Sequence, residues 1–139
     1  MSDKTGVPFN AIQNAVYTLF KTAPAITGGV YDEVPSDSVT WPYTVLGEPQ
    51  DSPLEARGVK GRAVLFPFES FSRNYGGKQE IYTIQGQIIT KLTAGKLTIT
   101  GWNEVWKTYN QGKVERIEKE ASPLVYKGII TMLIVVAKS

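Results

Sequence analysis

The sequence predicts an α+β fold, in which a mixed, mostly antiparallel β-sheet carries two amphipathic helices packed on one face. Two stretches repeat apolar residues at helical spacing, and several others are rich in β-branched and aromatic residues between Gly and Pro turns. These stretches follow one another in the order α-β-β-β-α-β-β-β. With 139 residues, 42% of them hydrophobic and 20% charged, the chain is expected to form a single domain over residues 1–139.

The first helix is predicted from Phe9, because Phe9, Ile12, Val16 and Phe20 recur at helical spacing. It should end near Lys21–Ala23, since a proline follows and disfavours helical geometry in the residue before it. Residues 1–7 are predicted to be a flexible N-terminus.

Two short strands are predicted next, over Val30–Val34 and Tyr43–Gly47. Pro35 stops the first of them and Pro42 opens the second, where a missing N–H donor is tolerated. We expect these two strands to be neighbours in the sheet.

A polar segment over residues 49–61 is broken by two prolines and two glycines. It is predicted to be a protruding loop or the tip of a hairpin. A strand over Arg62–Ser72 follows, and Pro67 within it predicts an edge strand or a bulged one.

The second helix is predicted from Lys78 to about Leu92, with Ile81, Ile84 and Ile88 on its buried line. The strands predicted after it are Leu97–Thr100, Glu104–Tyr109, Lys113–Glu118 and Leu124–Ala137. Periodicity leaves open whether the middle two are separate or one strand bent between them.

Charge is divided unevenly along the chain. Residues 1–55 carry 2 basic against 7 acidic residues (−5), residues 56–100 carry 7 against 2 (+5), and residues 101–139 carry 6 against 4 (+2). Opposed charge of this kind could steer head-to-tail contact between subunits, unless the segments interleave in space.

The composition argues against several kinds of chemistry. The chain has no cysteine and no histidine, which excludes disulfides, thiolate metal sites, Ser-His-Asp catalysis and His-bound zinc. Asp32 and Glu33 are adjacent in a predicted strand, so they point to opposite faces and do not form a carboxylate pair. The sequence predicts no catalytic residue, no cofactor and no metal.

Two groups of side chains suggest binding instead. A basic group interleaved with Phe68, Phe71 and Tyr75 is compatible with a small nucleic-acid-binding module; its members are Arg57, Lys60, Arg62, Arg73 and Lys78. The aromatic residues Trp41, Trp102, Trp106 and Tyr109 are interpreted either as anchors of a protein interface or as part of the core.

Several motifs together resemble one known family. "VYDEVP" and "WPYTVLGEPQ" lie between "TAPAITGG" and "FSRNYGGKQEI", and "KLTAGKLTITG" and "LVYKGIITMLIVVA" follow in the same order as in that family. From about Phe9 to Ala137 the chain resembles the phage tail-completion family, the small tail terminator proteins of long-tailed phages.

The resemblance implies a structural virion protein, located in the tail at its head-proximal end and in the host cytoplasm during assembly. Such proteins form a ring, typically a hexamer, that stops polymerisation of the tail tube and joins the tail to the neck and capsid. The implied partners are further copies of the chain, the tail tube protein and neck or connector proteins. Neither a membrane nor a specific nucleic acid is implied, although genomic DNA passes through such a ring. Another head-tail connector or neck ring protein is the alternative.

The interface with a neighbouring subunit or the tube is predicted at one charged loop and at two tryptophans. The residues are Asp51, Glu55, Arg57, Lys60, Arg62, Trp102 and Trp106.

Overall fold

The computed structural model of the chain describes residues 8–23, 25–32, 42–56, 59–73, 77–117 and 125–138. The α+β class is confirmed, with the second helix after four strands. In chain order the elements are α1 (Phe9–Lys21), β1 (Gly29–Tyr31), β2 (Tyr43–Leu46), β3 (Gln50–Ala56), β4 (Val59–Arg73), α2 (Gly77–Thr93), β5 (Trp102–Ile117) and β6 (Val125–Lys138).

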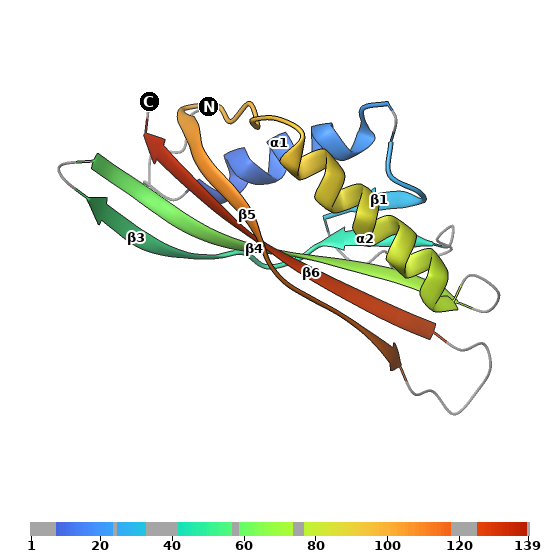
Figure 1. Cartoon of the computed structure of the whole chain (residues 1–139). Helices are drawn as coiled ribbons and strands as arrows, with labels where there is room; N and C mark the ends of the chain where they lie inside the picture. The colour runs from blue at the N-terminus through green and yellow to red at the C-terminus, as the bar shows by residue number, and fades with distance from the viewer. Residues whose placement is uncertain are drawn as a thin grey trace.

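The molecule has two layers, with both helices on the same side of a twisted sheet (Figure 1). The six-stranded sheet has the order β1-β2-β4-β6-β5, and β3 pairs with β4 beside that path. β1 runs parallel to β2, whereas the other pairs are antiparallel. The long strands β4 and β6 therefore lie in the interior of the sheet, and the helices cover one of its faces.

The pairing of β1 with β2 confirms that the two short strands are neighbours. Gly29 lies opposite Tyr43 and Tyr31 lies opposite Val45. The turn into β1 requires glycine at position 28, where φ is +87° and a Cβ would lie 2.2 Å from the Pro42 carbonyl oxygen.

Most of the segment predicted as a protruding loop is a β-hairpin. β3 pairs with β4 from Gln50 opposite Leu65 to Ala56 opposite Val59. Of the two forms expected for residues 49–61, the hairpin is the one present, and it extends away from the helices as an arm (Figure 1). Because each strand supplies the other's backbone partners, the polar sequence can project from the body of the sheet and remain ordered.

The prediction that Pro67 marks an edge or bulged strand is wrong, because β4 is a central strand. On one side it pairs with β6 along its length, including Pro67 opposite Thr131. On the other side its partner changes from β3 to β2, and Pro67 lies at that change, where its carbonyl oxygen accepts a 2.9 Å bond from Gly47 N–H. The missing N–H of Pro67 points to the same side, into the break between the two partners, so no ladder bond is lost.

β5 is one continuous strand, which decides between the two forms expected for this region. Its pairing with β6 shifts between Glu104 and Trp106 and again between Tyr109 and Gln111. Each shift adds a residue without a partner, as in a β-bulge, and increases the local twist. The strand predicted at Leu97–Thr100 is absent, and only Ile99 forms an isolated bridge there, with Trp102.

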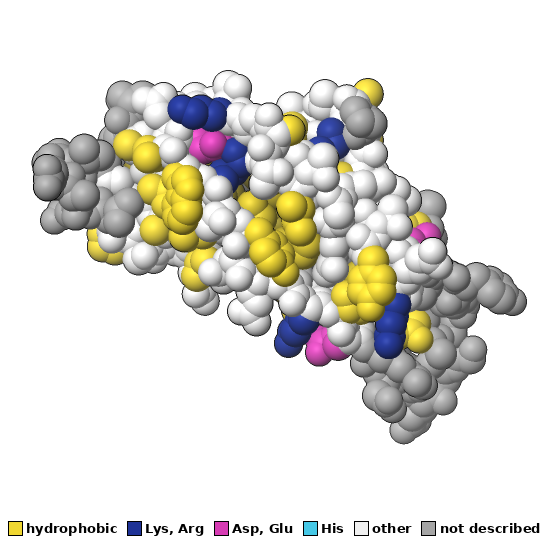
Figure 2. All heavy atoms as spheres, viewed as in Figure 1, with side chains coloured by type: hydrophobic (Ala, Val, Ile, Leu, Met, Phe, Trp, Pro, Cys, Tyr) yellow, Lys and Arg dark blue, Asp and Glu magenta, His cyan; other side chains and the backbone are white. Residues whose placement is uncertain are grey.

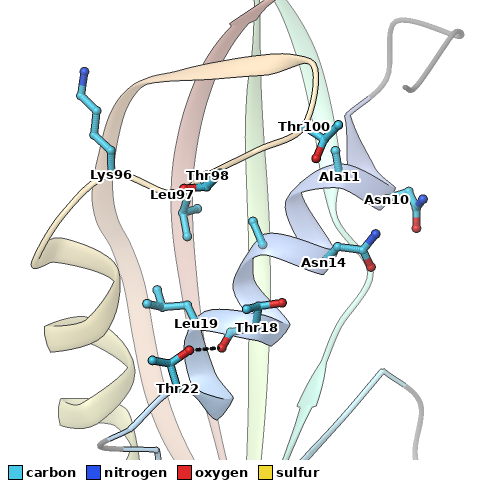
Figure 3. Close-up of a pocket in the computed structure, with 11 residues that line it drawn as sticks. Asn10, Ala11, Asn14, Thr18, Leu19, Thr22, Lys96, Leu97, Thr98 and Thr100 are labelled. Carbon is cyan, nitrogen blue, oxygen red and sulfur yellow. Dashed lines mark hydrogen bonds between the residues drawn. The ribbon is translucent and has the colours of Figure 1, made fainter. Parts of the chain in front are cut away.

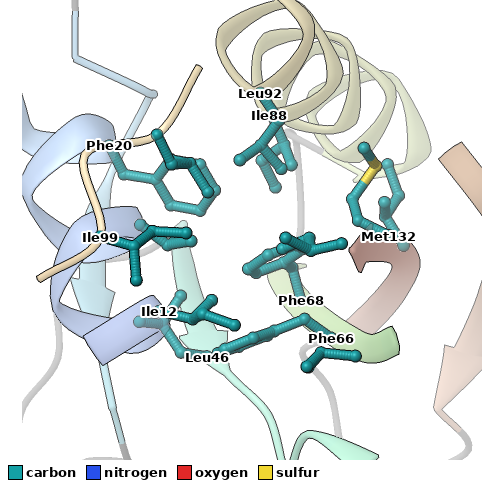
Figure 4. Close-up of a cluster of buried hydrophobic side chains, with 14 of the residues drawn as sticks. Ile12, Phe20, Leu46, Phe66, Phe68, Ile88, Leu92, Ile99 and Met132 are labelled. Carbon is teal, nitrogen blue, oxygen red and sulfur yellow. The ribbon is translucent and has the colours of Figure 1, made fainter. Parts of the chain in front are cut away.

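The hydrophobic core lies between the sheet and the two helices (Figure 4). Phe20 of α1 meets Phe68 of β4 edge to face at 5.3 Å, and Phe66 stacks on Phe68 at 5.0 Å. From α2, the buried line is Ile81, Ile84, Ile88 and Leu92, all 0% exposed. Burial of side chains of this size, at about 1.5–3 kcal/mol each, is what holds the helices on the sheet.

The helices also approach the sheet closely at a glycine, and they form hydrogen bonds with the sheet and with each other. α2 approaches β6 so closely at Gly128 that a Cβ there would lie 2.4 Å from Ile81 Cγ2. Gln85 Nε2 donates to the Lys113 carbonyl oxygen at 3.2 Å, and Lys91 Nζ donates to the Thr22 carbonyl oxygen at the end of α1 at 2.8 Å.

Candidate assembly surfaces

The face of the sheet opposite the helices is apolar over much of its area. Residues of β4 and β6 that alternate with the core residues point to this side, and Leu65 lies opposite Leu133 on it. The apolar residues concerned are Ala63, Leu65, Ile129, Leu133, Val135 and Ala137. None of the described elements packs on this face (Figure 1). We call it the bare face. β6 is apolar on both sides, a pattern typical of strands covered on both faces.

The other end of the bare face carries charge that is already paired. Lys127 Nζ lies 3.5 Å from Glu69 Oε2 and 5.8 Å from the centre of the Phe71 ring. Lys113 and Glu115 of β5 approach each other at 4.0 Å, with both side chains about half exposed. The bare face therefore changes from apolar near the arm to charged near the start of β6.

β5 forms one edge of the sheet and exposes large hydrophobic side chains. Val105, Trp106 and Tyr109 are 56%, 53% and 45% exposed. Trp106 lies opposite Val135, so its side chain adjoins the apolar part of the bare face. Figure 2 shows separate groups of exposed hydrophobic side chains among polar ones on one side of the molecule. Exposed tryptophan and tyrosine are typical of protein interfaces.

The edge formed by β3 differs from the edge formed by β5. Pro53 lies in the middle of β3, opposite Arg62 of β4. A proline cannot donate a backbone hydrogen bond to an added strand, and it is one of the usual ways of protecting a sheet edge. β5 contains no proline over its whole length.

The two tryptophans predicted to form an interface are in different surroundings. Trp102 is 6% exposed and belongs to the hydrophobic core, together with Leu97 and Ile99. It therefore offers little surface to a partner. Trp106 points to the bare face. Strict alternation would place residues 102 and 106 on the same side, and the bulge between Glu104 and Trp106 is what separates them, so the sequence pattern alone does not distinguish the two.

The charged residues predicted on the arm are only partly brought together. Arg62 Nη1 lies 3.1 Å from Asp51 Oδ2, across the hairpin. Asp51 Oδ2 is buried and receives no hydrogen bond from the described residues, so the charge of Arg62 is what compensates it. Glu55 and Lys60 lie opposite each other in the register, and Arg57 lies outside the described residues.

The aromatic residues expected between basic side chains in a nucleic-acid-binding module are engaged elsewhere. Phe68 is 0% exposed in the core, and Phe71 stacks on Tyr43 with ring centres 5.0 Å apart. Tyr75 lies outside the described residues. Neither phenylalanine is free to stack on a base, which removes the main support for that alternative.

Tyr43 itself belongs to an aromatic group on the β1–β2 side of the bare face. It is 6% exposed and meets Tyr31 edge to face at 6.1 Å. Burial raises the pKa of the Tyr43 hydroxyl above its ordinary value, because the charged phenolate would be poorly solvated there.

A buried ion pair holds the connection between α2 and β5. Lys107 Nζ donates to Glu104 Oε1 at 2.5 Å and to the Gly95 carbonyl oxygen at 2.8 Å, and both charged side chains are 6% exposed. Glu104 Oε1 also accepts the Leu97 backbone N–H at 2.9 Å. This network fixes residues 95–104 against the start of β5.

A groove of about 550 Å³ runs between α1 and residues 96–100 (Figure 3). Asn10, Asn14, Thr18 and Thr22 line it from the helix. The sequence prediction missed this groove, although the four-residue spacing of these polar residues beside the apolar stripe of α1 is a signal that could have indicated it.

Comparison with known proteins then identifies the family. The family model of tail completion protein gp17 matches residues 14–137, which is most of the chain. The chain belongs to the tail completion protein gp17 family. It is therefore a structural protein of the virion tail, as the sequence motifs implied.

A solved structure gives the same fold. A chain in the structure "Virion of native gene transfer agent (GTA) particle" has a TM-score of 0.81 and 18% sequence identity to this chain. The match covers 94% of this chain and 98% of that one. No curated protein matches the chain.

The described part of this tail completion protein has four surfaces open to a partner, namely the bare face, the β5 edge, the arm and the groove. Within the described ranges there is no group of three or more Asp and Glu side chains placed to hold a metal ion. Among the helices of those same ranges, none is both long and apolar enough to span a membrane.

Proposed function

We propose that this tail completion protein forms a hexameric ring that caps the head-proximal end of the phage tail tube. The ring ends polymerisation of the tube and joins the tail to the neck and capsid. The observation that carries the proposal is the bare apolar face beside the exposed Trp106, in a chain of the tail completion family. Exposing a large apolar face to water costs free energy. Such a face is therefore typical of a protein that buries it against a partner in an assembly.

A closed ring requires two different, complementary surfaces on each subunit. The bare face with the β5 edge is one of them, because it is apolar and carries Trp106. The arm is the other, since its strand β3 pairs with β4 on the side away from β6 and β5. The proposed contacts of the arm with the next subunit or the tube involve Arg57 and Lys60, while Asp51 and Arg62 hold its base together. The role is structural, and no step in it requires catalysis.

Native mass spectrometry of the purified chain, alone and mixed with short tail tubes, tests the proposal. We expect discrete rings, or binding at tube ends with a fixed number of copies. A ring that binds purified neck protein but ignores tube ends would make the protein a neck component. A monomer that ignores tubes and shifts a DNA probe in a salt-dependent manner would contradict the assembly role.

Two sets of variants assign the surfaces. Trp106→Glu places a charge on the bare face and should abolish ring formation and capping. Tyr82→Glu is the matched control, because Tyr82 is 57% exposed on α2, away from both surfaces. Arg57→Glu combined with Lys60→Glu tests the arm, and unchanged assembly in that double variant would remove the arm from the interface.

A further inference from the structure

The groove between α1 and residues 96–100 has two polar walls and an apolar floor. The helix wall is formed by Asn10, Asn14, Thr18 and Thr22, all of which are exposed. The floor contains Ala11, Ala15 and Leu19 of the next line along the helix. The short side chains of Ala11 and Ala15 leave space between the two walls.

In the opposite wall, every second residue faces the groove, instead of every fourth. Residues 96–100 alternate between exposed and buried, so Lys96, Thr98 and Thr100 face solvent and the groove, while Leu97 and Ile99 enter the core. Thr100 lies near Asn10 and Ala11, and Lys96 stands at the end of the segment nearer to α2 (Figure 3). Glu104 and Lys107 hold this wall in place through Leu97 N–H and the Gly95 carbonyl oxygen.

The repeats of both walls match the repeat of an extended polypeptide. Residues four apart on a helix rise by about 6 Å, which sets the spacing of Asn10, Asn14 and Thr18. Alternate residues of an extended segment are about 6.6 Å apart, which sets the spacing of Lys96, Thr98 and Thr100. An extended chain lying between them would present an equivalent backbone group to each wall at nearly the same interval.

The chemistry of the walls also suits a backbone rather than particular side chains. An asparagine amide both donates and accepts, as does a threonine hydroxyl, so each can bond to a peptide N–H or C=O. Within the described structure, the side chains of Asn10, Asn14, Thr98 and Thr100 form no hydrogen bond with another residue. Lys96 is the charged residue among the described lining residues, and it favours a carboxylate at its end of the groove.

We propose that this groove binds an extended polypeptide segment of another virion protein, with small side chains and a carboxylate near Lys96. The groove lies on the helix side of the sheet, opposite the bare face, so it stays open when subunits associate through that face. The choice of another virion protein over a second copy of this chain rests on the proposed function. The inference that the groove binds an extended chain rests on the groove itself and does not depend on that function.

Peptide titration of the full-length ¹⁵N-labelled chain by NMR tests the proposal. The probe is the capped peptide Ala-Ser-Ala-Ser-Ala-Ser-Asp, compared with the same peptide ending in Lys and with one in which Pro replaces each Ala. We expect the Asp peptide to shift the amide signals of Asn10, Asn14 and Thr98 with a Kd of about 1 mM or tighter. The Lys peptide should bind about 3-fold more weakly. The Pro version, which lacks alternate N–H donors, should not bind.

Two substitutions locate the contact. Asn14→Ala removes one amide from the wall and should weaken binding about 5- to 10-fold, whereas Gln79→Ala, on the exposed face of α2, should leave it unchanged. Lys96→Glu should reverse the preference between the Asp and Lys peptides.

The outcomes separate this proposal from the ring. If no peptide shifts the groove signals, or if Asn14→Ala binds as well as the unmodified chain, the groove does not bind a polypeptide, whatever the mass spectra show. If the groove signals shift on concentrating the protein without peptide, a second copy occupies it and the assignment to another virion protein is wrong. If the chain binds the peptide but never forms rings, the groove proposal is supported and only the ring proposal is contradicted.

Discussion

The two faces of the sheet are built from the same two central strands but lie in different surroundings. On the helix side Phe66, Phe68 and Met132 are 0% exposed. On the other side Leu65, Ile129 and Leu133, their neighbours along the same strands, remain partly exposed. The side chains are comparably apolar, so composition does not explain the difference. What differs is the presence of a second layer, which the described helices supply on one side only.

The difference in burial separates the residues that stabilise the fold from those that the proposed assembly would use. A single layer of helices buries enough apolar surface to fold a domain of this size. The partly exposed residues of the bare face, such as Leu65, Ile129 and Leu133, contribute less to the stability of the monomer, because water still reaches them. Substitutions on the two faces should therefore affect different measurements.

The largest effect is expected from truncation on the covered face. Phe68→Ala removes a ring that contacts both Phe20 and Phe66, and should lower the free energy of unfolding by about 3–5 kcal/mol. Leu65→Ala on the bare face should cost about 1 kcal/mol. Urea denaturation followed by circular dichroism gives both values, and equal losses would show that the two faces are equally buried in the free chain.

A smaller loss of stability is expected from breaking the buried ion pair of Glu104 and Lys107 in β5. Lys107→Met leaves the Glu104 carboxylate buried without its cation, and should lower the free energy of unfolding by about 2–4 kcal/mol. The double variant with Glu104→Gln removes both charges and should recover part of that loss. If the double variant is no more stable than Lys107→Met, the ion pair is not the cause.

The bare face is tested by a substitution that the monomer should tolerate. Leu133→Lys lies on an uncovered surface, where the lysine can extend its ammonium group into water, so the loss in unfolding free energy should be about 1 kcal/mol or less. Ring formation, measured by native mass spectrometry, should be lost. A folded variant that still forms rings would remove this face from the subunit interface.

The smallest effect is expected on the pH dependence of stability, through Tyr43 in the aromatic group beside β1 and β2. Because burial raises the pKa of Tyr43 in the folded state, its contribution to stability is fully present below about pH 10 and is lost as pH rises through the raised pKa. In Tyr43→Phe the free energy of unfolding should therefore fall less steeply above about pH 10. Denaturation curves at pH values on either side of 10 measure the slopes, and identical slopes would contradict the prediction.

Local patterns were sufficient for much of the fold. Apolar residues at helical spacing located α1 and α2 to within a residue or two, since Phe9–Lys21 and Gly77–Thr93 agree with the predicted ranges. Pro42 located the start of β2, at Tyr43, but the end predicted for β1 at Val34 is wrong, because β1 ends at Tyr31. The pattern was less informative for the arm, because polar residues with two prolines and two glycines form either a loop or a hairpin, and only pairing with β4 decides between them.

The candidate sites depended more on tertiary structure. Trp102 and Trp106 belong to the same strand, and which of them reaches a partner follows from the side to which each points. The groove is formed by two segments more than seventy residues apart in sequence, so neither segment predicts it alone.

The sequence by itself determined the fold class, the extents of the helices and the motifs of the tail completion family. These follow from local spacing and from turn residues, which act within a few positions of the chain. Only the tertiary structure decided that β4 is central despite Pro67, that Trp102 is buried while Trp106 is not, and that one face of an apolar sheet is bare. Those outcomes depend on which strands become neighbours and on where the helices pack, and contacts of that kind join residues far apart in the sequence.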